Sequence, residues 1–150
     1  MRNLIAKFNM DRPRRSSANR KIHCHFPEAW VEDFEPLINA MTKDPKDRHV
    51  LAAAVRSHSE LIVTYNRRDF PKSSVEQFDI EVQGPSTFLR GLYDLEPGLT
   101  VHKVHEQAKA IGITFQRLLL SLSKNAPGFV QYFCEEQGIS LPSEQASSPQ

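Results

Sequence analysis

The sequence predicts an α/β fold with a parallel sheet, followed by C-terminal helices. Two observations support this prediction. Between residues 44 and 94, helix-like and strand-like segments follow one another in the order helix, strand, strand, helix. From residue 99 onwards the apolar residues recur at the spacing that is typical of helices.

The composition is that of an ordinary globular chain. Its 150 residues suffice for one domain, with room for a short appendage. The net charge of +1 gives no general attraction to nucleic acid or to a membrane, so any nucleic-acid site has to be local. Residues 1–20 lack the apolar core of a signal peptide, and no apolar run is long enough to span a bilayer. Together with two cysteines far apart in the sequence, this predicts a cytoplasmic protein in a reducing compartment, without a membrane partner.

The first 41 residues give few clear signals. Leu4, Ile5 and Phe8 are at helical spacing but have no cap before them, which is typical of the second half of a helix. Further along, "HFPEAWVEDFEPLINAM" supplies apolar residues for a core. We expect a short strand near 29–32 and a helical turn near 35–41.

The clearest unit starts at "DPKDRHVLAAAVRSH". Asp44 is expected to cap this helix and Pro45 to occupy its first position, which puts Asp47 at the third position. The continuous apolar run "ELIVTYN" (60–66) is typical of a buried parallel strand. After a turn, "FDIEVQG" (78–84) predicts a second strand.

The rest of the chain predicts helices. "PSTFLRGLYD" begins on a proline, as helices often do, and two further helices are expected over 99–112 and 113–125, with a short one near 127–137. The polar tail "SLPSEQASSPQ" is expected to be disordered. The predicted organisation is therefore an α/β part over 1–95, a helical extension over 96–138 and a tail over 139–150.

Three polar residues are expected to meet at one edge of the sheet. A helix that precedes a parallel strand runs antiparallel to it, so the start of the helix lies where the strand ends. The helix is about 20 Å long at 1.5 Å per residue, and the strand is about as long at 3.3 Å per residue. Asp47, Asn66 and Asp69 should therefore share the carboxyl edge, where open α/β sheets usually place their sites. Carboxylate and amide oxygens favour a hard divalent cation, Mg²⁺ or Mn²⁺.

Each of these residues also has a purely structural interpretation. An acid in the first helical turn, such as Asp47, interacts favourably with the helix dipole. The segment Asp69-Phe70-Pro71 is compatible with a simple turn. Arg67 and Arg68 stand beside the proposed edge and could contact the phosphates of RNA, and Arg48 could do the same.

The stretch "DPKDRHVLAAAVRSHSELIVTYNRRDFP", continued by "FDIEVQGPSTFL", resembles the C-terminal half of a PIN domain, and most closely the bacterial VapC-type toxins. The resemblance covers about residues 1–95, and the residues beyond look like a helical extension of this branch. It implies a PIN-like three-layer sandwich with a parallel sheet that lacks its N-terminal strand here. It also implies a metal-dependent endoribonuclease, the toxin of a toxin–antitoxin pair, with an RNA substrate and an antitoxin as partners.

The family gathers four acidic positions around Mg²⁺ or Mn²⁺, and the metal activates a water for attack on an RNA phosphodiester. By this resemblance Asp47 matches the third acid, while Asn66 and Asp69 match the region of the fourth. Asp47 and Asp69 would then be catalytic, and the metal ligands would be these two residues and Asn66. Thr64 matches the strand-end position and would orient metal-bound waters.

The chain departs from the family pattern at the first two acids. A strand ending in a "DAN"-like pattern and a glutamate on the following helix are expected before Met1, so that the sequence is N-terminally incomplete relative to the family. Two carboxylates and an asparagine are expected to bind Mg²⁺ weakly. The alternative is therefore a catalytically inactive remnant that at most binds an antitoxin or itself, since a missing central strand would leave a sheet edge to cover. A basic adaptor that binds RNA without cutting has little support at a net charge of +1.

Weaker signals remain. "IHCHF" (22–26) carries two histidines and a cysteine but no second group at zinc-ligand spacing. "RPRR" (12–15) is a local basic cluster that is typical of a solvated loop and could also contact RNA phosphates. The acids at 28, 32, 33 and 35 lie where the family has no ligands. The leucine-rich run 117–122 is expected to form core or a partner surface.

Overall fold

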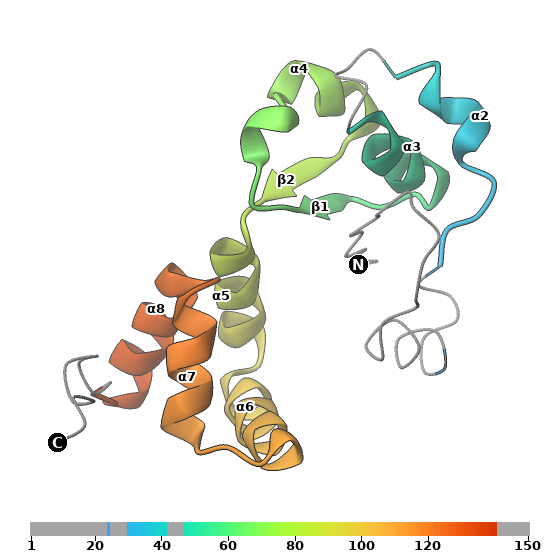
Figure 1. The fold of residues 1–150 in the computed structure, drawn as a ribbon. Helices are drawn as coiled ribbons and strands as arrows, with labels where there is room; N and C mark the ends of the chain where they lie inside the picture. The colour runs from blue at the N-terminus through green and yellow to red at the C-terminus, as the bar shows by residue number, and fades with distance from the viewer. Residues whose placement is uncertain (1–23, 25–29, 42–46, 141–150) are drawn as a thin grey trace, which may run out of the picture. The chain divides into compact units, whose positions relative to one another are not determined.

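A computed structural model describes residue 24, residues 30–41 and residues 47–140. The chain divides into two compact units that meet in the sequence between Gln83 and Gly84 (Figure 1). The first contains a small sheet with helices around it, and the second contains helices in its described residues. The boundary predicted near residue 95, between the PIN-like part and the helical extension, stays a prediction.

The sheet of the first unit is parallel, as predicted. Strand β1 (Leu61–Val63) pairs with β2 (Glu81–Gln83), with Leu61 opposite Glu81 and Val63 opposite Gln83. One further hydrogen bond follows at each end: Glu81 N donates to Glu60 O, and Thr64 N donates to Gln83 O, both at 2.9 Å. The backbone pairing therefore reaches Thr64, the last residue before the chain turns.

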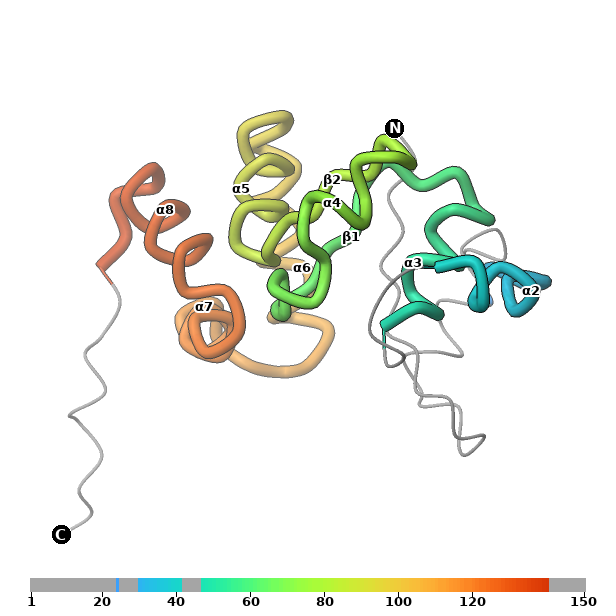
Figure 2. The backbone as a smooth tube through the Cα atoms, turned by 90° about the horizontal axis from the view of Figure 1, so that it is seen from above, coloured from blue at the N-terminus to red at the C-terminus, as the bar shows by residue number. Residues whose placement is uncertain are grey.

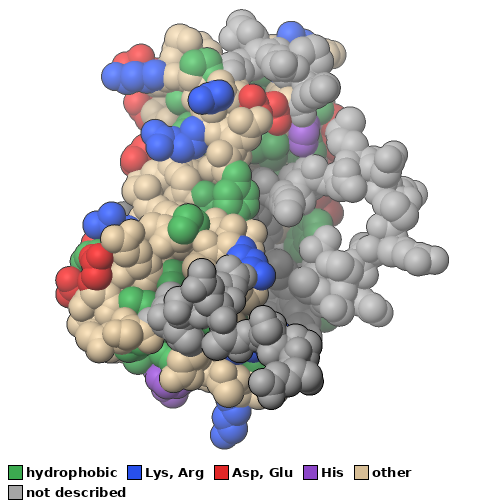
Figure 3. All heavy atoms as spheres, turned by 60° about the vertical axis from the view of Figure 1, so that its left-hand side comes forward, with side chains coloured by type: hydrophobic (Ala, Val, Ile, Leu, Met, Phe, Trp, Pro, Cys, Tyr) green, Lys and Arg blue, Asp and Glu red, His purple; other side chains and the backbone are tan. Residues whose placement is uncertain are grey.

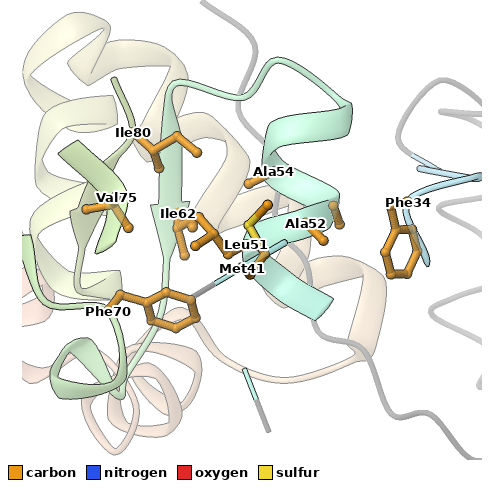
Figure 4. Close-up of a cluster of buried hydrophobic side chains, with 10 residues drawn as sticks. Phe34, Met41, Leu51, Ala52, Ala54, Ile62, Phe70, Val75 and Ile80 are labelled. Atoms are coloured by element: carbon orange, nitrogen blue, oxygen red, sulfur yellow. The ribbon is translucent and has the colours of Figure 1, made fainter. Parts of the chain in front are cut away.

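Helix α3 (Arg48–Arg56) packs against β1 through its buried face, Leu51 to Ala54. The small alanine side chains let the helix approach its neighbours closely. At its C-terminal end the Ser57 hydroxyl donates to Ala53 O at 2.8 Å, and four residues, 57–60, lead into β1. So short a connection makes α3 and β1 neighbours that run in opposite directions, as Figure 4 shows with Leu51 next to Ile62.

The core of the first unit combines residues from several of its described segments. Around α3 and β1, Phe34 and Met41 flank the short helix α2 (Glu35–Ile38), and Phe70, Val75 and Ile80 come from the connection between the strands (Figure 4). Burying side chains of this size stabilises a fold by about 1.5–3 kcal/mol each. Phe70 in particular anchors the turn that follows β1, since only 5% of it is exposed.

The connection between the strands is more structured than the predicted turn. It contains the 3-10 segment η2 (Arg67–Asp69), helix α4 (Lys72–Val75) and the 3-10 segment η3 (Glu76–Phe78). The Ser74 hydroxyl donates to Pro71 O at 2.7 Å and fixes the first turn of α4. Parallel strands need such a crossover, because a two-residue turn cannot return the chain to the same edge.

Over its described residues 84–140 the second unit packs four helices, all of them predicted: α5 (Pro85–Leu95), α6 (Pro97–Ile111), α7 (Phe115–Ser123) and α8 (Pro127–Gln137). Figure 2 follows their backbone from above through short connections. The buried core contains Tyr93, Leu119, Ala126, Phe129, Val130, Phe133 and Cys134. The leucine-rich run of α7 supplies part of it, with Leu118 and Leu119 buried, so core packing accounts for that run.

Several predictions need correction or stay outside the described residues. Residues 30–32 form no strand, so the strand predicted near 29–32 is wrong in its described part, whereas the helical turn at 35–38 is confirmed. Asp47 occupies the N-cap position of α3 instead of the third helical position, because the helix begins at Arg48. Asp44, the segments 1–23 and 25–29, and the tail from 141 lie outside the described residues. In that described part the sheet has two strands, so the α/β class holds and the three-layer sandwich stays a prediction.

Candidate functional site

The chain leaves β1 through a turn that is fixed at both ends. Asn66 N donates to the Thr64 hydroxyl at 3.1 Å, directly after Thr64 has completed the pairing with β2. Asp69 N then donates to Asn66 O, and Phe70 N to Arg67 O, both at 3.1 Å. Because Phe70 is buried in the core, the segment between Thr64 and Phe70 is held by a strand on one side and by packing on the other.

This turn brings two of the predicted site residues into contact. The Asn66 side-chain amide donates through Nδ2 to the Oδ2 of Asp69. The single helical turn of η2 between them explains this contact, since residues three apart face the same side. Asn66 is exposed and Asp69 is half-buried, so this carboxylate and amide group are presented to solvent at the strand end.

Asp47 and Arg48 lie at the same edge, on a different element. Asp47 is the N-cap of α3, and its carbonyl accepts from Val50 N and Leu51 N at 3.1 and 3.3 Å. Since α3 runs antiparallel to β1, the start of α3 lies where β1 ends (Figure 4). Both residues are half-buried, and a carboxylate at this position is favoured by the partial positive charge of the helix N-terminus.

The arginines give the edge a local positive charge. Arg67 and Arg68 are exposed and line an open hollow together with Tyr65 and Asn66. The hollow thus joins two guanidinium groups to an aromatic ring. On the face drawn in Figure 3, the coloured basic and acidic side chains are interspersed.

Tyr65 is a candidate functional residue that the sequence pattern alone does not single out. Its side chain is 67% exposed, whereas Ile62 of the same run is 5% exposed. The run "ELIVTYN" was interpreted as one buried strand, and Tyr65 was counted in it. The signal that could have separated it is the polar stretch Asn66 to Arg68, which follows at once and marks the end of the strand.

The donors at this edge fit a hard divalent cation by their chemistry. Asp47 and Asp69 offer carboxylate oxygens, and Asn66 offers an amide oxygen, which are the ligand types that Mg²⁺ and Mn²⁺ prefer. Within residues 24, 30–41 and 47–140 no three or more His, Cys, Asp and Glu side chains gather in a way that could hold a metal ion. Among the described residues, the edge thus offers two carboxylates, and its third oxygen donor is an amide.

A second polar cluster lies within the helical unit, between α5 and α8. The Tyr132 hydroxyl donates to Asp94 Oδ1 at 2.6 Å, and this hydrogen bond raises the pKa of Tyr132 to about 12. The Arg90 guanidinium lies 4.3 Å from the centre of the Tyr132 ring, at cation–π distance. Burial raises the pKa of the nearby Cys134 thiol. The cluster joins two helices of one core, which is a structural role.

Comparison with known proteins finds a partial relative. The chain is 43% identical over 67 residues to the protein named "Putative ribonuclease VapC50" of Mycobacterium tuberculosis (strain ATCC 25618 / H37Rv). The matched region is 45% of this chain and 40% of the relative, so the chain spans less than half of that protein's length. No family model matches the chain, and no solved structure matches it. The identity supports a relationship to VapC-type proteins over part of the chain.

No helix in the described parts of the chain is long and apolar enough to cross a membrane. The described cysteines, exposed Cys24 and buried Cys134, are both free thiols.

Proposed function

We propose that this chain is a PIN-like, metal-dependent endoribonuclease of the VapC type, the toxin of a toxin–antitoxin pair. The observation that carries the proposal is the contact between Asn66 and Asp69 at the end of a parallel strand, on the edge where α3 begins with Asp47. The partial identity with a protein named as a ribonuclease supports the reaction class.

In this proposal Asp47, Asn66 and Asp69 hold Mg²⁺ or Mn²⁺. When bound, the cation would lower the pKa of a water and offset negative charge on an RNA phosphate. Asp47 and Asp69 bind and orient it from two separate elements, the start of α3 and the turn after β1. Thr64 supports the site indirectly. Its hydroxyl accepts a hydrogen bond from the backbone N–H of Asn66 and so fixes the backbone that carries the Asn66 side chain.

The arginines are proposed to bind the substrate. Arg67 and Arg68 are exposed on the rim of the hollow, and Arg48 is at the start of the same helix that Asp47 caps. Guanidinium groups form paired hydrogen bonds to phosphate oxygens, which would hold an RNA backbone against the edge. Because the net charge of the whole chain is only +1, RNA binding is proposed to depend on this local cluster of arginines and not on the overall charge of the protein.

A cognate antitoxin is the proposed protein partner, and the cytoplasm, where RNA and antitoxin are found, is the proposed compartment. A helix of the antitoxin would cover an apolar groove of the toxin. One hollow of this character lies on α7 and α8 and is lined by Pro127, Val130, Cys134 and Ile139, among others. Self-association is a further possibility to test, because each strand of the described two-stranded sheet has an edge without a neighbouring strand in that sheet.

One observation favours a second, non-catalytic function. The resemblance implies four acidic positions, and the described residues of this edge combine two carboxylates with one amide. Two carboxylates bind a divalent cation more weakly than four, because each lost negative charge removes attraction. The alternative is therefore a module that binds an antitoxin or a second copy of itself without cutting RNA.

Cleavage of a structured RNA tests the proposal. We would compare the 150-residue chain with Asp47→Asn and Asp69→Asn, each with Mn²⁺ and with EDTA. Asp79→Asn is the matched control, because Asp79 is exposed, precedes β2 at the opposite edge and has a φ of 54°, which asparagine tolerates. We expect cleavage that requires Mn²⁺ and both edge aspartates but not Asp79. A folded chain that binds RNA and leaves it intact with Mn²⁺ would favour the non-catalytic module.

A further inference from the structure

We infer that Tyr65 is a stacking platform for an unpaired nucleobase of the RNA. The inference rests on the proposed function in taking RNA as the ligand. What it adds is a binding residue: Tyr65 would stack on a base that is unpaired, in a loop, a bulge or a free end.

The exposure of Tyr65 is the first observation. An exposed apolar residue on its own needs no explanation, since such residues are common on protein surfaces. Tyr65, however, is 67% exposed and lines a hollow together with Asn66, Arg67 and Arg68. Its ring therefore forms part of a concave surface in which the other side chains are polar or charged.

The backbone on both sides of Tyr65 is fixed, which is the second observation. Thr64 N donates to Gln83 O at 2.9 Å on one side, and Asn66 N donates to the Thr64 hydroxyl at 3.1 Å on the other. A ring on a fixed backbone loses little conformational freedom when it binds, so that more of the stacking energy becomes affinity. Tyr65 is thus better suited to a platform than a tyrosine on a long, unsupported loop.

The charges around the ring are the third observation. Arg67 and Arg68 follow two and three residues after Tyr65 on the same hollow. Single-stranded nucleic acid is bound by this combination, with cationic groups on the backbone phosphates and aromatic rings on the bases. In a duplex the bases are already stacked on one another, and sequence-specific binding of RNA mostly targets unpaired bases. The hollow is therefore expected to discriminate by strandedness more than by base identity.

The position of Tyr65 links this platform to the proposed chemistry. Tyr65 immediately precedes Asn66, whose amide contacts the carboxylate of Asp69. A base stacked on Tyr65 would leave its own phosphate near the edge where Asp47, Asn66 and Asp69 are proposed to hold a cation. An exposed tyrosine beside arginines also suits a protein partner, and the experiment below treats that as a contrary outcome.

The test measures binding without cleavage. The full chain is titrated in EDTA into a fluorescently labelled oligoribonucleotide, first as a single strand and then annealed to its complement, and anisotropy reports the affinity. We expect Tyr65→Ala to weaken single-strand binding about tenfold, since the loss of one stacked base corresponds to roughly such a change. Tyr65→Phe keeps the ring and should restore most of that affinity, and duplex binding should change little in either variant.

Leu95→Ala is the control, because Leu95 is 78% exposed and belongs to α5. Far-UV circular dichroism shows whether each variant keeps its fold. The inference is overturned if the wild-type chain binds no RNA, if Tyr65→Ala binds the single strand as well as the wild type does, or if it loses single-strand and duplex affinity equally. If Tyr65→Ala binds RNA as well as the wild type does, the exposed tyrosine would more plainly serve to bind a protein partner.

The same experiment separates this inference from the proposed function. Binding in EDTA needs neither a cation nor a catalytic acid. Ring-dependent binding without cleavage in Mn²⁺ would sustain the platform and count against the ribonuclease. Cleavage that requires Asp47 and Asp69 but proceeds equally well in Tyr65→Ala, with unchanged RNA affinity, would support the ribonuclease and count against the platform.

Discussion

The two units of the chain are stabilised by different kinds of contact. In the helical unit, the Phe133 ring contacts three aromatic neighbours, with ring centroids 5.6 Å from Tyr93, 5.7 Å from Phe129 and 6.1 Å from Phe115. In the sheet-containing unit, the two strands that the structure describes have three residues each and depend on α3 and on a crossover to cover them. The polar edge proposed as a site therefore belongs to the sheet-containing unit. Its strands are short, and the buried face of α3 consists mostly of alanines.

Because of this difference, we expect mutations in the two units to lower stability in different ways. An aromatic core loses much packing when one ring is removed, but the residues that begin and end its helices stay in place. A small sheet has little intrinsic stability, because short strands need packing against a helix to persist. The proposed site should therefore be sensitive to packing changes in α3, although those residues touch no ligand.

The largest expected effect is that of Phe133→Ala. Phe133 has no exposed surface and lies at the centre of the aromatic contacts, so its loss should lower the free energy of unfolding of the helical unit by about 4 kcal/mol. Hydrogen exchange resolved by segment should show faster exchange in 84–140 than in 47–83. Equal acceleration in both segments would mean that the units unfold together and would remove the basis of the comparison.

Leu51→Ala should have the next largest effect, in the other unit. Leu51 is 1% exposed and packs between α3 and β1, and we expect a loss of about 3 kcal/mol. Fluorescence of Trp30, the chain's one tryptophan, follows urea unfolding of this unit. Arg56→Ala, at the exposed end of the same helix, is the control and should unfold like the wild type. A small effect of Leu51→Ala would show that the sheet does not depend on this contact.

Two glycines of the helical unit should respond with opposite signs. Gly138 ends α8 with a φ of 62°, so Gly138→Ala should cost about 1 kcal/mol in backbone strain. Gly91 lies inside α5, and a Cβ there would meet nothing within 4 Å, so Gly91→Ala should stabilise by about 1 kcal/mol. Thermal melts of both variants check this pair. Destabilisation by Gly91→Ala would mean that this exposed face of α5 has a partner.

The smallest expected effect concerns Tyr132. Its hydrogen bond to Asp94 favours the neutral phenol in the folded state, which raises the pKa to about 12 from 10.0. The stabilisation is therefore fully present below pH 10 and is lost as the pH rises through about 12. Absorbance at 295 nm should show one of the three tyrosines ionising late, and Asp94→Ala should bring that step to lower pH. If Asp94→Ala leaves the titration unchanged, the hydrogen bond does not control this group.

The helical unit could be predicted from the sequence because its signals are local. Pro85 and Pro127 mark the starts of α5 and α8, and Gly138 follows the last turn of α8. The parallel strand and its polar end were predicted for a similar reason. Asn66 and Asp69 are three residues apart, so a single turn is enough to bring them together.

The remaining features depend on packing that no local pattern encodes. Trp30 and Val31 have strand-like composition, yet the chain there leads into α2, and Phe34 is buried against the α3 cluster instead. The crossover between the strands was missed because Ser74 and Val75 become buried only when α4 packs on the sheet. The start of α3 was placed too early because Asp44 and Asp47 both suit an N-cap, and Tyr65 was hidden in an apolar run.

The most direct test of the proposed site is Mn²⁺ binding to the whole chain, measured by electron paramagnetic resonance of the free ion. We expect saturable binding of one ion, weakened by both Asp47→Asn and Asp69→Asn and unchanged by Asp79→Asn. That result would make the edge at α3 and β1 a cation site, whatever its rate of cleavage. Binding that is absent from the folded chain, or that survives both edge substitutions, would contradict a cation site at this edge.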